Sequence, residues 1–429
     1  MTDATTLDPG DFEEHPHRRA LLDELHARPF QAMSTPTRLM RFGFLTDARQ
    51  AETARLDFAA LCAAHGAVAP RPGAKHHVAR LGEIDLAFEQ HGEFTTYTFI
   101  LRGEGAAPFE PDSGARARRL PALGKPGAHL VSIDLCLAAV EATDFERWFD
   151  PTSLAAADVK NGAATMATDF RPTADGFIRI LVADRALSVN AAGALCQRLL
   201  EIETYRMLAM LGLPEAQRLT PRTARMEEEL TRVAQETTKS GGLADDSGLL
   251  RRLTLLAAEL EADTSASAYR FGASRAYDEI IRQRLQAIGE EPRAQYPTFG
   301  SFRARRGAPA MRTILTIERR QHALSEKVTR ATQLLRSRID VAIEEQNGQL
   351  LAAMNDRARM QLRLQQTVEG LSVAAISYYV VGLAGYVFKA MKDAGAPIDP
   401  NIAMGAAVPL SILGVWWVVR RIRRSHSEH

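Results

Sequence analysis

Histidine and acidic side chains near the start of the chain are the residues best suited to bind a metal ion. The candidates are Glu13, Glu14, His15, His17, Asp23 and His26. Imidazole nitrogens and carboxylate oxygens are common zinc ligands. His15 and His17 flank a proline, however, and no second histidine follows His26 at the i+4 spacing that places two ligands on one helical face. We therefore interpret the group as the solvated start of a short helix over 16–29 and assign no metal site, with metal binding as the alternative.

Two further stretches contain residue types that bind metals or phosphates in other proteins. His76 and His77 follow Lys75 where a strand is expected to begin, so we interpret them as the entry to that strand. The stretch "GEGAAPFEPDSGARARR" at 103–119 contains glycines, but it has neither the GxxxxGK[ST] nor the GxGxxG spacing of a phosphate loop. GxSxG, HExxH and Cys/His nucleophile patterns do not occur either. The sequence assigns no catalytic residue, no cofactor and no metal, and we do not expect an enzyme.

A basic segment, "SFRARRG" at 301–307, precedes the longest expected helix. Clustered arginines bind anionic lipid headgroups when they lie near a membrane surface. A straight helix after this segment would instead hold it tens of Å from the bilayer, at about 1.5 Å per residue. We interpret the segment as a solvated or subunit-contact loop, with lipid contact as the alternative.

Composition limits the classes of partner and the compartment. The chain has 429 residues, 24% of them charged, and its net charge is +1, so we expect no nucleic-acid partner. Cys62, Cys136 and Cys196 lie far apart in apolar surroundings, which is typical of buried thiols in a reducing compartment. The N-terminal stretch has no apolar core of a signal peptide, so we expect the bulk of the chain to stay in the cytoplasm.

Residues 1–189 are expected to form a cytosolic α+β domain. Alternating or β-branched stretches predict strands, and a helical period over 47–66 predicts a helix between the first two. The expected strands are "RLMRFGFL", "HHVARLG", "IDLAFEQHG", "EFTTYTFILRG", "HLVSIDLCLAAV" and "GFIRILVAD". Residues 104–127 are rich in glycine, proline, alanine and arginine, and we expect them to form a long exposed loop. Most connections have antiparallel hairpin chemistry.

Residues 190–310 are expected to form a helical region with linkers. It begins with a strong helix for which Asn190 is the expected N-cap. Breaks in the helical pattern predict a hairpin tip near 237–248 and a linker over 289–309.

Residues 311–367 then predict one long helix that leads to the membrane. A coiled-coil-like stripe repeats along its first half, and such a stripe needs a partner, so we expect a homo-oligomer. The stripe comprises Ile317, Leu324, Val328, Ala331, Leu335 and Ala342. An interior glycine costs a helix only about 1 kcal/mol, so a continuous helix is favoured, with two antiparallel helices folded at 346–348 as the alternative.

Two long apolar runs near the end of the chain predict a transmembrane hairpin in the lipid bilayer. Residues 368–388 contain one charge, Glu369, and residues 401–419 contain none. A helix of about 20 residues spans the hydrocarbon core. The connection, 389–400, concentrates charged, glycine and proline residues, which are typical of a turn in water. A buried soluble hairpin is the alternative.

The distribution of basic residues predicts the orientation of this hairpin. Arginines flank its outer ends at Arg357, Arg359, Arg363, Arg420, Arg421, Arg423 and Arg424. The connection contains Lys389 and Lys392, balanced by Asp393 and Asp399. Because Lys and Arg near a span favour the cytoplasmic side, we expect a multi-pass inner-membrane protein with both termini cytoplasmic, a basic cytosolic tail at 420–429 and an extracytoplasmic connection.

Small residues recur along one side of the first expected span. They are Gly370, Ala374, Ser377 and Gly385. Such a stripe lets two helices pack closely, and it also lines pores formed by a ring of subunits. Both interpretations, a packing face against the second span and a pore face, remain open at this point.

Several stretches resemble an uncharacterised bacterial family of membrane-anchored proteins. They are "HPHRRALLDELHARPF", "NGAATMATDFRP" and "EIETYRMLAMLGLPEAQ". The resemblance extends over nearly the whole chain and implies a membrane location without an activity.

In architecture the chain is also similar to CorA-type divalent-cation channels. These combine a cytosolic α+β domain, one very long helix that becomes the first span, a short outer loop, a second span and a basic tail. The resemblance implies an oligomeric ion transporter or channel with a small cation as its partner. The Gly-Met-Asn signature that those channels carry after the first span is absent, since the chain reads "GLAGYVFKAMKD" there. A non-conducting membrane-anchored scaffold or sensor, whose cytosolic domain binds a partner or ligand, is the alternative function.

Overall fold

The computed structural model describes residues 14–18, 22, 31–141, 144–293, 295–395 and 399–426. The chain divides into two compact units. The first comprises Met1–Gln235 with Arg252–Arg330, and the second comprises Glu236–Arg251 with Ala331–His429.

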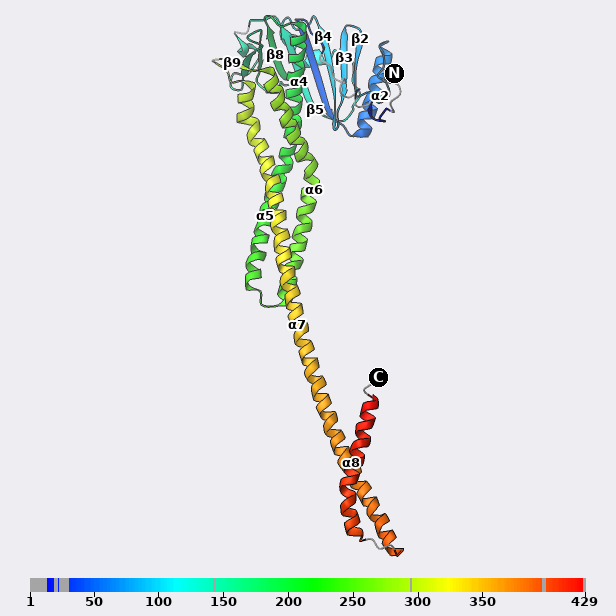
Figure 1. Cartoon of the computed structure of the whole chain (residues 1–429). Coiled ribbons are helices and arrows are strands. Elements are labelled where there is room, and N and C mark those ends of the chain that lie inside the picture. Colours follow the sequence, from blue (N-terminus) through cyan, green and yellow to red (C-terminus); the bar gives the residue numbers. More distant parts are fainter. Residues whose placement is uncertain are drawn as a thin grey trace, which may run out of the picture. The chain divides into compact units, whose positions relative to one another are not determined.

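The first unit contains a nine-stranded mixed sheet (Figure 1). Its strands are β1 (Thr37–Leu45), β2 (His76–Leu81), β3 (Ile84–Gln90), β4 (Phe94–Arg102), β5 (Ala128–Ala138), β6 (Ala155–Val159), β7 (Ala164–Thr168), β8 (Ile178–Asp184) and β9 (Glu291–Pro292). Their order is β2-β3-β4-β1-β5-β8-β7-β6-β9. Among the described pairs, β5 and β8 run parallel and the others antiparallel. The predicted mixture of strands and helices is confirmed, including the β2-β3-β4 meander and the start of β2 at His76.

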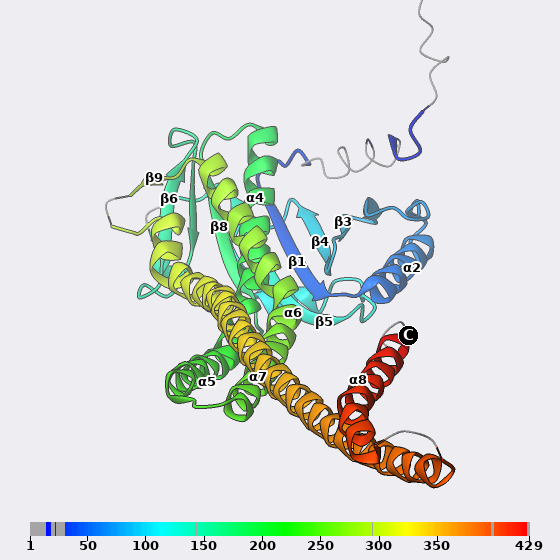
Figure 2. The same cartoon turned by 60° about the horizontal axis from the view of Figure 1, so that its bottom comes forward.

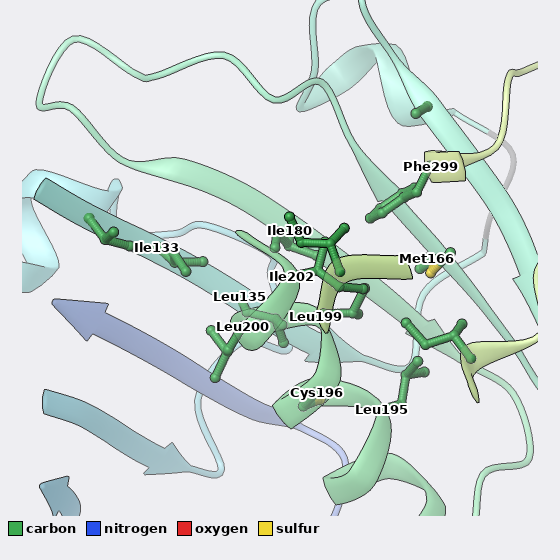
Figure 3. Close-up of a cluster of buried hydrophobic side chains, with 14 of the residues drawn as sticks. Ile133, Leu135, Met166, Ile180, Leu195, Cys196, Leu199, Leu200, Ile202 and Phe299 are labelled. Atoms are coloured by element: carbon green, nitrogen blue, oxygen red, sulfur yellow. The ribbon is translucent and has the colours of Figure 1, made fainter. Parts of the chain in front are cut away.

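Both faces of the sheet are buried because apolar side chains alternate between them along each strand. In β1, Leu39 belongs to one core cluster and Met40 to another on the opposite face. Helix α2 (Ala48–Ala64) contributes Phe58 and Cys62 to the cluster that contains Met40. Helix α4 (Val189–Met210) covers the other face, where its leucines pack on β5 and β8 (Figure 3).

Three strands went unpredicted, namely the two-residue β9 and the strands β6 and β7, whose side chains are small. β6 and β7 consist largely of alanine and threonine and are buried almost throughout. The hairpin between them turns at Lys160, Asn161 and Gly162, all with positive φ. An Asn-Gly pair is the strongest short-range signal of a β-hairpin, so the pair at 161–162 could have predicted this turn from the sequence.

Residues 104–127 are not the exposed loop that their composition predicted. They contain a short helix, α3 (Ser113–Ala117), and Phe109 and Arg116 within them are buried. Phe109 belongs to the third core cluster together with Cys136 and Leu181. The face of β5 and β8 opposite α4 is apolar, and residues 104–127 help to bury it.

Four helices follow β8 before the last helix of the chain, with the short strand β9 between the third and the fourth. They are α4, α5 (Gly212–Lys239), α6 (Leu243–Ile288) and α7 (Phe299–Asp393). α4 begins two residues before the expected point, because the hydroxyl of Ser188, rather than the side chain of Asn190, accepts from the backbone N–H of Ala191 at 3.3 Å. The predicted hairpin tip is confirmed between α5 and α6.

The stripe on the first half of α7 is buried within the chain. In the first unit, Ile317, Leu324 and Val328 are each at most 2% exposed. Buried side chains of α5 and α6 face them in a three-helix bundle (Figure 1), and Arg320 of α7 donates to Glu227 of α5 at 2.7 Å. The inference that this stripe needs a second copy of the chain was wrong, because α5 and α6 satisfy it.

Helix α7 begins earlier than predicted, at Phe299, so the expected linker ends eleven residues sooner. The carboxylate of Glu290 accepts from the backbone N–H groups of Phe299 and Gly300 at 2.8 and 2.9 Å, which fixes the start of the helix. Pro309 lies inside it. The basic segment 301–307 is therefore helical rather than a loop. The helix is continuous through Gly348, so the alternative of two antiparallel helices is wrong.

In the second unit, the end of α7 lies beside α8 (Pro400–His426) (Figures 1 and 2). Both helices contain stretches that are long and apolar enough to cross a membrane, by length and composition. Half-buried residues repeat every fourth position on α8, and this stripe faces α7. It comprises Ala403, Ala407, Ser411, Val415 and Val419. The small side chains of Ala403, Ala407 and Ser411 allow the two helices to approach closely over that part of the stripe.

Candidate functional site

A cavity of the first unit lies where three helices meet the turn after β7. It has a volume of about 230 Å³. Its wall is mainly apolar, and three arginines and one aspartate contribute the charged groups. The lining residues are Phe170, Ile202, Arg206, Ala209, Met210, Asp278, Ile281, Leu285, Phe299, Phe302, Arg303, Arg306 and Gly307.

Helical periodicity explains which residues line this pocket. The residues from α4 lie at 202, 206, 209 and 210, and those from α6 at 278, 281 and 285. The residues from α7 occupy its first turns at 299, 302, 303, 306 and 307. Positions three or four apart share one face of a helix, so each helix contributes a single face to the pocket.

Phe170 reaches the pocket from a tight turn. Its φ is 56°, which a bulky residue seldom adopts and which costs about 1–3 kcal/mol. The hydroxyl of Thr168 accepts from the backbone N–H of Phe170 at 3.2 Å, and the carboxylate of Asp169 accepts from the N–H of Arg171 at 3.0 Å. These bonds hold the turn in the conformation that presents the ring.

Aromatic rings form one side of the site. The ring of Phe170 stacks on that of Phe302, with centroids 4.3 Å apart, and meets the edge of Phe299 at 5.2 Å. The guanidinium of Arg206 lies 5.4 Å from the ring centroid of Phe170, and that of Arg306 lies 5.4 Å from the centroid of Phe302. Cations at this distance are attracted to the faces of aromatic rings.

The charged groups leave the site with a positive excess. Arg206 forms two hydrogen bonds to the buried carboxylate of Glu203, at 2.6 and 2.8 Å. Burial alone would lower the pKa of Arg206, but the charge and hydrogen bonds of Glu203 raise it overall, so the guanidinium stays protonated. Arg303 donates to Asp278 at 2.5 Å. Within the described residues, no carboxylate pairs with Arg306, whose side chain is exposed.

Half of the first predicted candidates, at the N-terminus, lie outside the described residues. Glu13, Asp23 and His26 are outside the described residues, whereas Glu14, His15 and His17 are exposed. Among the residues that the structure describes, no group of three or more His, Cys, Asp or Glu could hold a metal ion. The three cysteines are free and buried, as predicted, and burial raises the pKa of the Cys196 thiol to about 12.

The small residues of the first span do not share one environment. Ser377 is 5% exposed, and a Cβ added to Gly385 would lie 2.7 Å from the sulfur of Met404 on α8, so these two face α8. Gly370 and Ala374 are exposed.

The arginines that flank the outer ends of the hairpin lie on both helices of the second unit. Arg357, Arg359 and Arg363 are exposed on α7. On α8, the guanidinium groups of Arg420 and Arg421 lie 4.8 and 5.3 Å from the ring centroids of Trp416 and Trp417. The side chains of Arg423 and Arg424 are outside the described part of the chain.

A family model described as "Protein of unknown function (DUF3422)" matches residues 13–426. The chain belongs to this family. The DUF3422 match includes both units and every residue of the pocket, so the predicted resemblance to an uncharacterised family is confirmed. No curated protein and no solved structure matches the chain.

No residue that lines the pocket was predicted as a site residue, although two of the segments that form the pocket carried the family resemblance. "NGAATMATDFRP" supplies Phe170, and "EIETYRMLAMLGLPEAQ" supplies the α4 face. The basic segment 301–307, which was interpreted as a solvated loop, supplies Phe302, Arg303, Arg306 and Gly307. The aromatic and arginine residues of these segments were visible in the sequence, but nothing in the sequence indicated that the three segments meet in the fold.

Proposed function

We propose that this protein is a membrane-anchored sensor or scaffold of the bacterial inner membrane. The α7–α8 hairpin anchors it, and its N-terminal domain lies in the cytoplasm and binds a small ligand in the arginine-rimmed pocket. The observation that carries the proposal is the presence, in one chain without a catalytic motif, of an apolar hairpin exposed to its surroundings and a mainly apolar pocket with arginines in its wall.

Exposed side chains of the hairpin support the anchor. Large apolar residues such as Tyr378, Leu383, Ile402, Leu410 and Trp417 are each more than half exposed. A soluble protein rarely exposes contiguous apolar surface on this scale, whereas lipid tails would cover it. Tryptophans beside arginines at one end of α8 fit the interface between lipid and water.

Thiol labelling in intact spheroplasts tests the anchor and its orientation. We expect a cysteine at Ala396→Cys to react with an impermeant maleimide, whereas Ser425→Cys should react only after permeabilisation. The native thiols give little background because all three are buried. Labelling of Ser425→Cys but not of Ala396→Cys would overturn the orientation, and equal labelling of both without permeabilisation would overturn the span.

The surface that supports self-association is not the predicted stripe but a second row of apolar residues farther along α7. Beyond the bundle, α7 exposes Ile343, Leu350, Met354 and Leu364, whose spacings of seven, four and ten keep them on one seam of a heptad repeat. Copies anchored in one bilayer share their orientation, which favours parallel pairing. We therefore propose that a second copy of the chain covers this seam.

CorA-like ion transport is the second candidate function. Gly370 and Ala374 favour it, because in a single chain they leave an exposed small-residue face that could line a path between subunits. Purified protein in liposomes should be assayed for Mg²⁺, Zn²⁺, Ni²⁺ and monovalent flux. If the channel hypothesis is correct, Ala374→Trp should abolish flux, whereas Leu383→Trp, at a large apolar position, should not. Absence of flux of every ion across pH and membrane potential would leave the sensor or scaffold.

A further inference from the structure

We propose that the pocket between α4, α6 and α7 binds a small organic anion with a compact apolar body and one carboxylate-like head. This inference rests on the proposed ligand-binding function and names the chemical class of the ligand. The two halves of such a ligand match the two halves of the pocket wall.

The apolar half of the wall determines the size and shape of the ligand's body. An apolar cavity of about 150 Å³ admits a benzene ring. The present cavity, at about 230 Å³, leaves space for a ring and a short polar arm. Ile281, Leu285 and Met210 provide aliphatic contacts, and Phe299 and Phe302 offer ring faces and edges. Aromatic partners favour stacked or edge-to-face contacts, which a flat body can supply.

The charged half determines the sign of the ligand's head. Three arginines line the cavity against one aspartate, and the carboxylate of Glu203 stands behind Arg206. Glu203 and Asp278 therefore leave one positive charge uncompensated. Arg206 and Arg303 form their carboxylate bonds with only some of their N–H groups. Arg306 has no carboxylate partner among the described residues. A guanidinium binds a carboxylate through charge-assisted hydrogen bonds, so an anion is favoured over a neutral or cationic head.

Other anion-binding features near the pocket are already used. The backbone N–H groups at the start of α7 point to Glu290, which accepts from Phe299 and Gly300. The ligand's head is therefore expected to bind arginine side chains and not the helix terminus. This distinction decides which variants test the site.

Three probes of similar size separate the contribution of the head from that of the ring. Phenylacetate, phenylacetamide and 2-phenylethylammonium share a ring and a short arm but carry an anionic, a neutral and a cationic head. Each is titrated against full-length protein in nanodiscs by ligand-observed saturation-transfer NMR, and empty nanodiscs give the lipid background. For a ligand of this size we expect phenylacetate to bind with a Kd on the order of 1 mM. Phenylacetamide should bind about tenfold more weakly, and 2-phenylethylammonium should not saturate.

The chain offers matched variants for the head and for the body. Arg306→Gln should weaken phenylacetate about fivefold to tenfold and leave phenylacetamide unchanged. Arg305→Gln is the control, since this neighbour is also exposed but does not line the cavity. Gly307→Leu should abolish binding of every probe by filling the mouth. A Cβ at position 307 meets its nearest atom, Cγ of Arg303, at an ordinary 3.5 Å, so the helix accepts the substitution.

The outcomes separate this inference from the proposed function. Preference for the anion that is lost in Arg306→Gln and kept in Arg305→Gln supports it. Equal binding of the anion and the amide, both lost in Gly307→Leu, would overturn the anionic class and leave the pocket as a ligand site. Two outcomes would overturn both the anionic class and the proposed ligand-binding function: saturation that Gly307→Leu leaves unchanged, or no saturation by any probe at 10 mM. A concentration of 10 mM is about tenfold above the Kd expected for phenylacetate.

Discussion

Replacing Asp134 by Asn should strongly destabilise the first unit, because this residue neutralises a charge inside the sheet. The side chains of Arg38 on β1 and Asp134 on β5 are both 0% exposed. Arg38 donates to the two carboxylate oxygens at 2.6 and 3.0 Å, and its remaining terminal nitrogen donates to the carbonyl of Pro111 at 2.8 Å. The pair thus fixes the centre of the sheet to the segment that covers it.

The expected magnitude follows from this burial. Removing one partner of a buried ion pair leaves an uncompensated charge and costs about 3–5 kcal/mol. Asn keeps the shape and one acceptor, so we expect the lower half of that range. At about 1.5 °C per kcal/mol for a unit of roughly 300 residues, the Tm should fall by roughly 4–6 °C.

Unfolding can be followed in nanodiscs by the fluorescence of Trp148, which packs against the third core cluster. Asp85→Asn is the matched control, because Asp85 also lies on a strand and pairs with arginines, but these are partly exposed. It should cost less than about 1 kcal/mol. The double variant Arg38→Met/Asp134→Leu removes both charges and should regain stability relative to Asp134→Asn. A Tm within 2 °C of wild type for Asp134→Asn, or a double variant less stable than the single one, would refute the reasoning.

Three further predictions address the bundle, the pH dependence and the exposed seam. Leu324→Ala should lower the free energy of unfolding by about 2–5 kcal/mol, whereas Leu351→Ala, at an exposed position, should change it by less than about 0.5 kcal/mol; similar losses in denaturant titrations would contradict the intramolecular packing. Burial alone would raise the pKa of Glu93, but hydrogen bonds, chiefly from Arg270, lower it overall. The ionised Glu93 therefore stabilises the folded state above the usual pKa of 4.5, and this contribution is lost as the pH falls through the lower pKa of the folded state. Glu93→Gln should therefore flatten the stability profile below pH 4.5 in thermal melts, and an unchanged slope would count against this assignment. Leu350→Glu should reduce the mass measured by light scattering in detergent, and a wild-type protein that is already monomeric at micromolar concentration would remove the case for the seam.

The sequence by itself determined the features that depend on local physical chemistry. Alternation, or richness in Thr, Tyr, Phe and Ile, predicted the β2-β3-β4 meander, since such residues favour strands whose adjacent side chains point to opposite faces. Absence of charge over 401–419 identified a helix fit for a membrane, because length and hydropathy suffice for that inference. The hairpin between β6 and β7 was equally local, through Asn161 and Gly162, but its alanine-rich strands hid the pattern.

Only the tertiary structure decided which segments meet. Arg38 and Asp134 are 96 residues apart, and neither position alone indicates a buried pair. A heptad stripe shows that Leu324 needs an apolar partner, but not whether that partner belongs to the same chain, and α5 and α6 supply it here. The pocket depends on both effects, because Phe170, Arg206 and Arg306 come from a turn and two helices whose faces converge only after the sheet and bundle have packed. Periodicity specifies the face of one helix, whereas the space between faces is set by packing among distant segments.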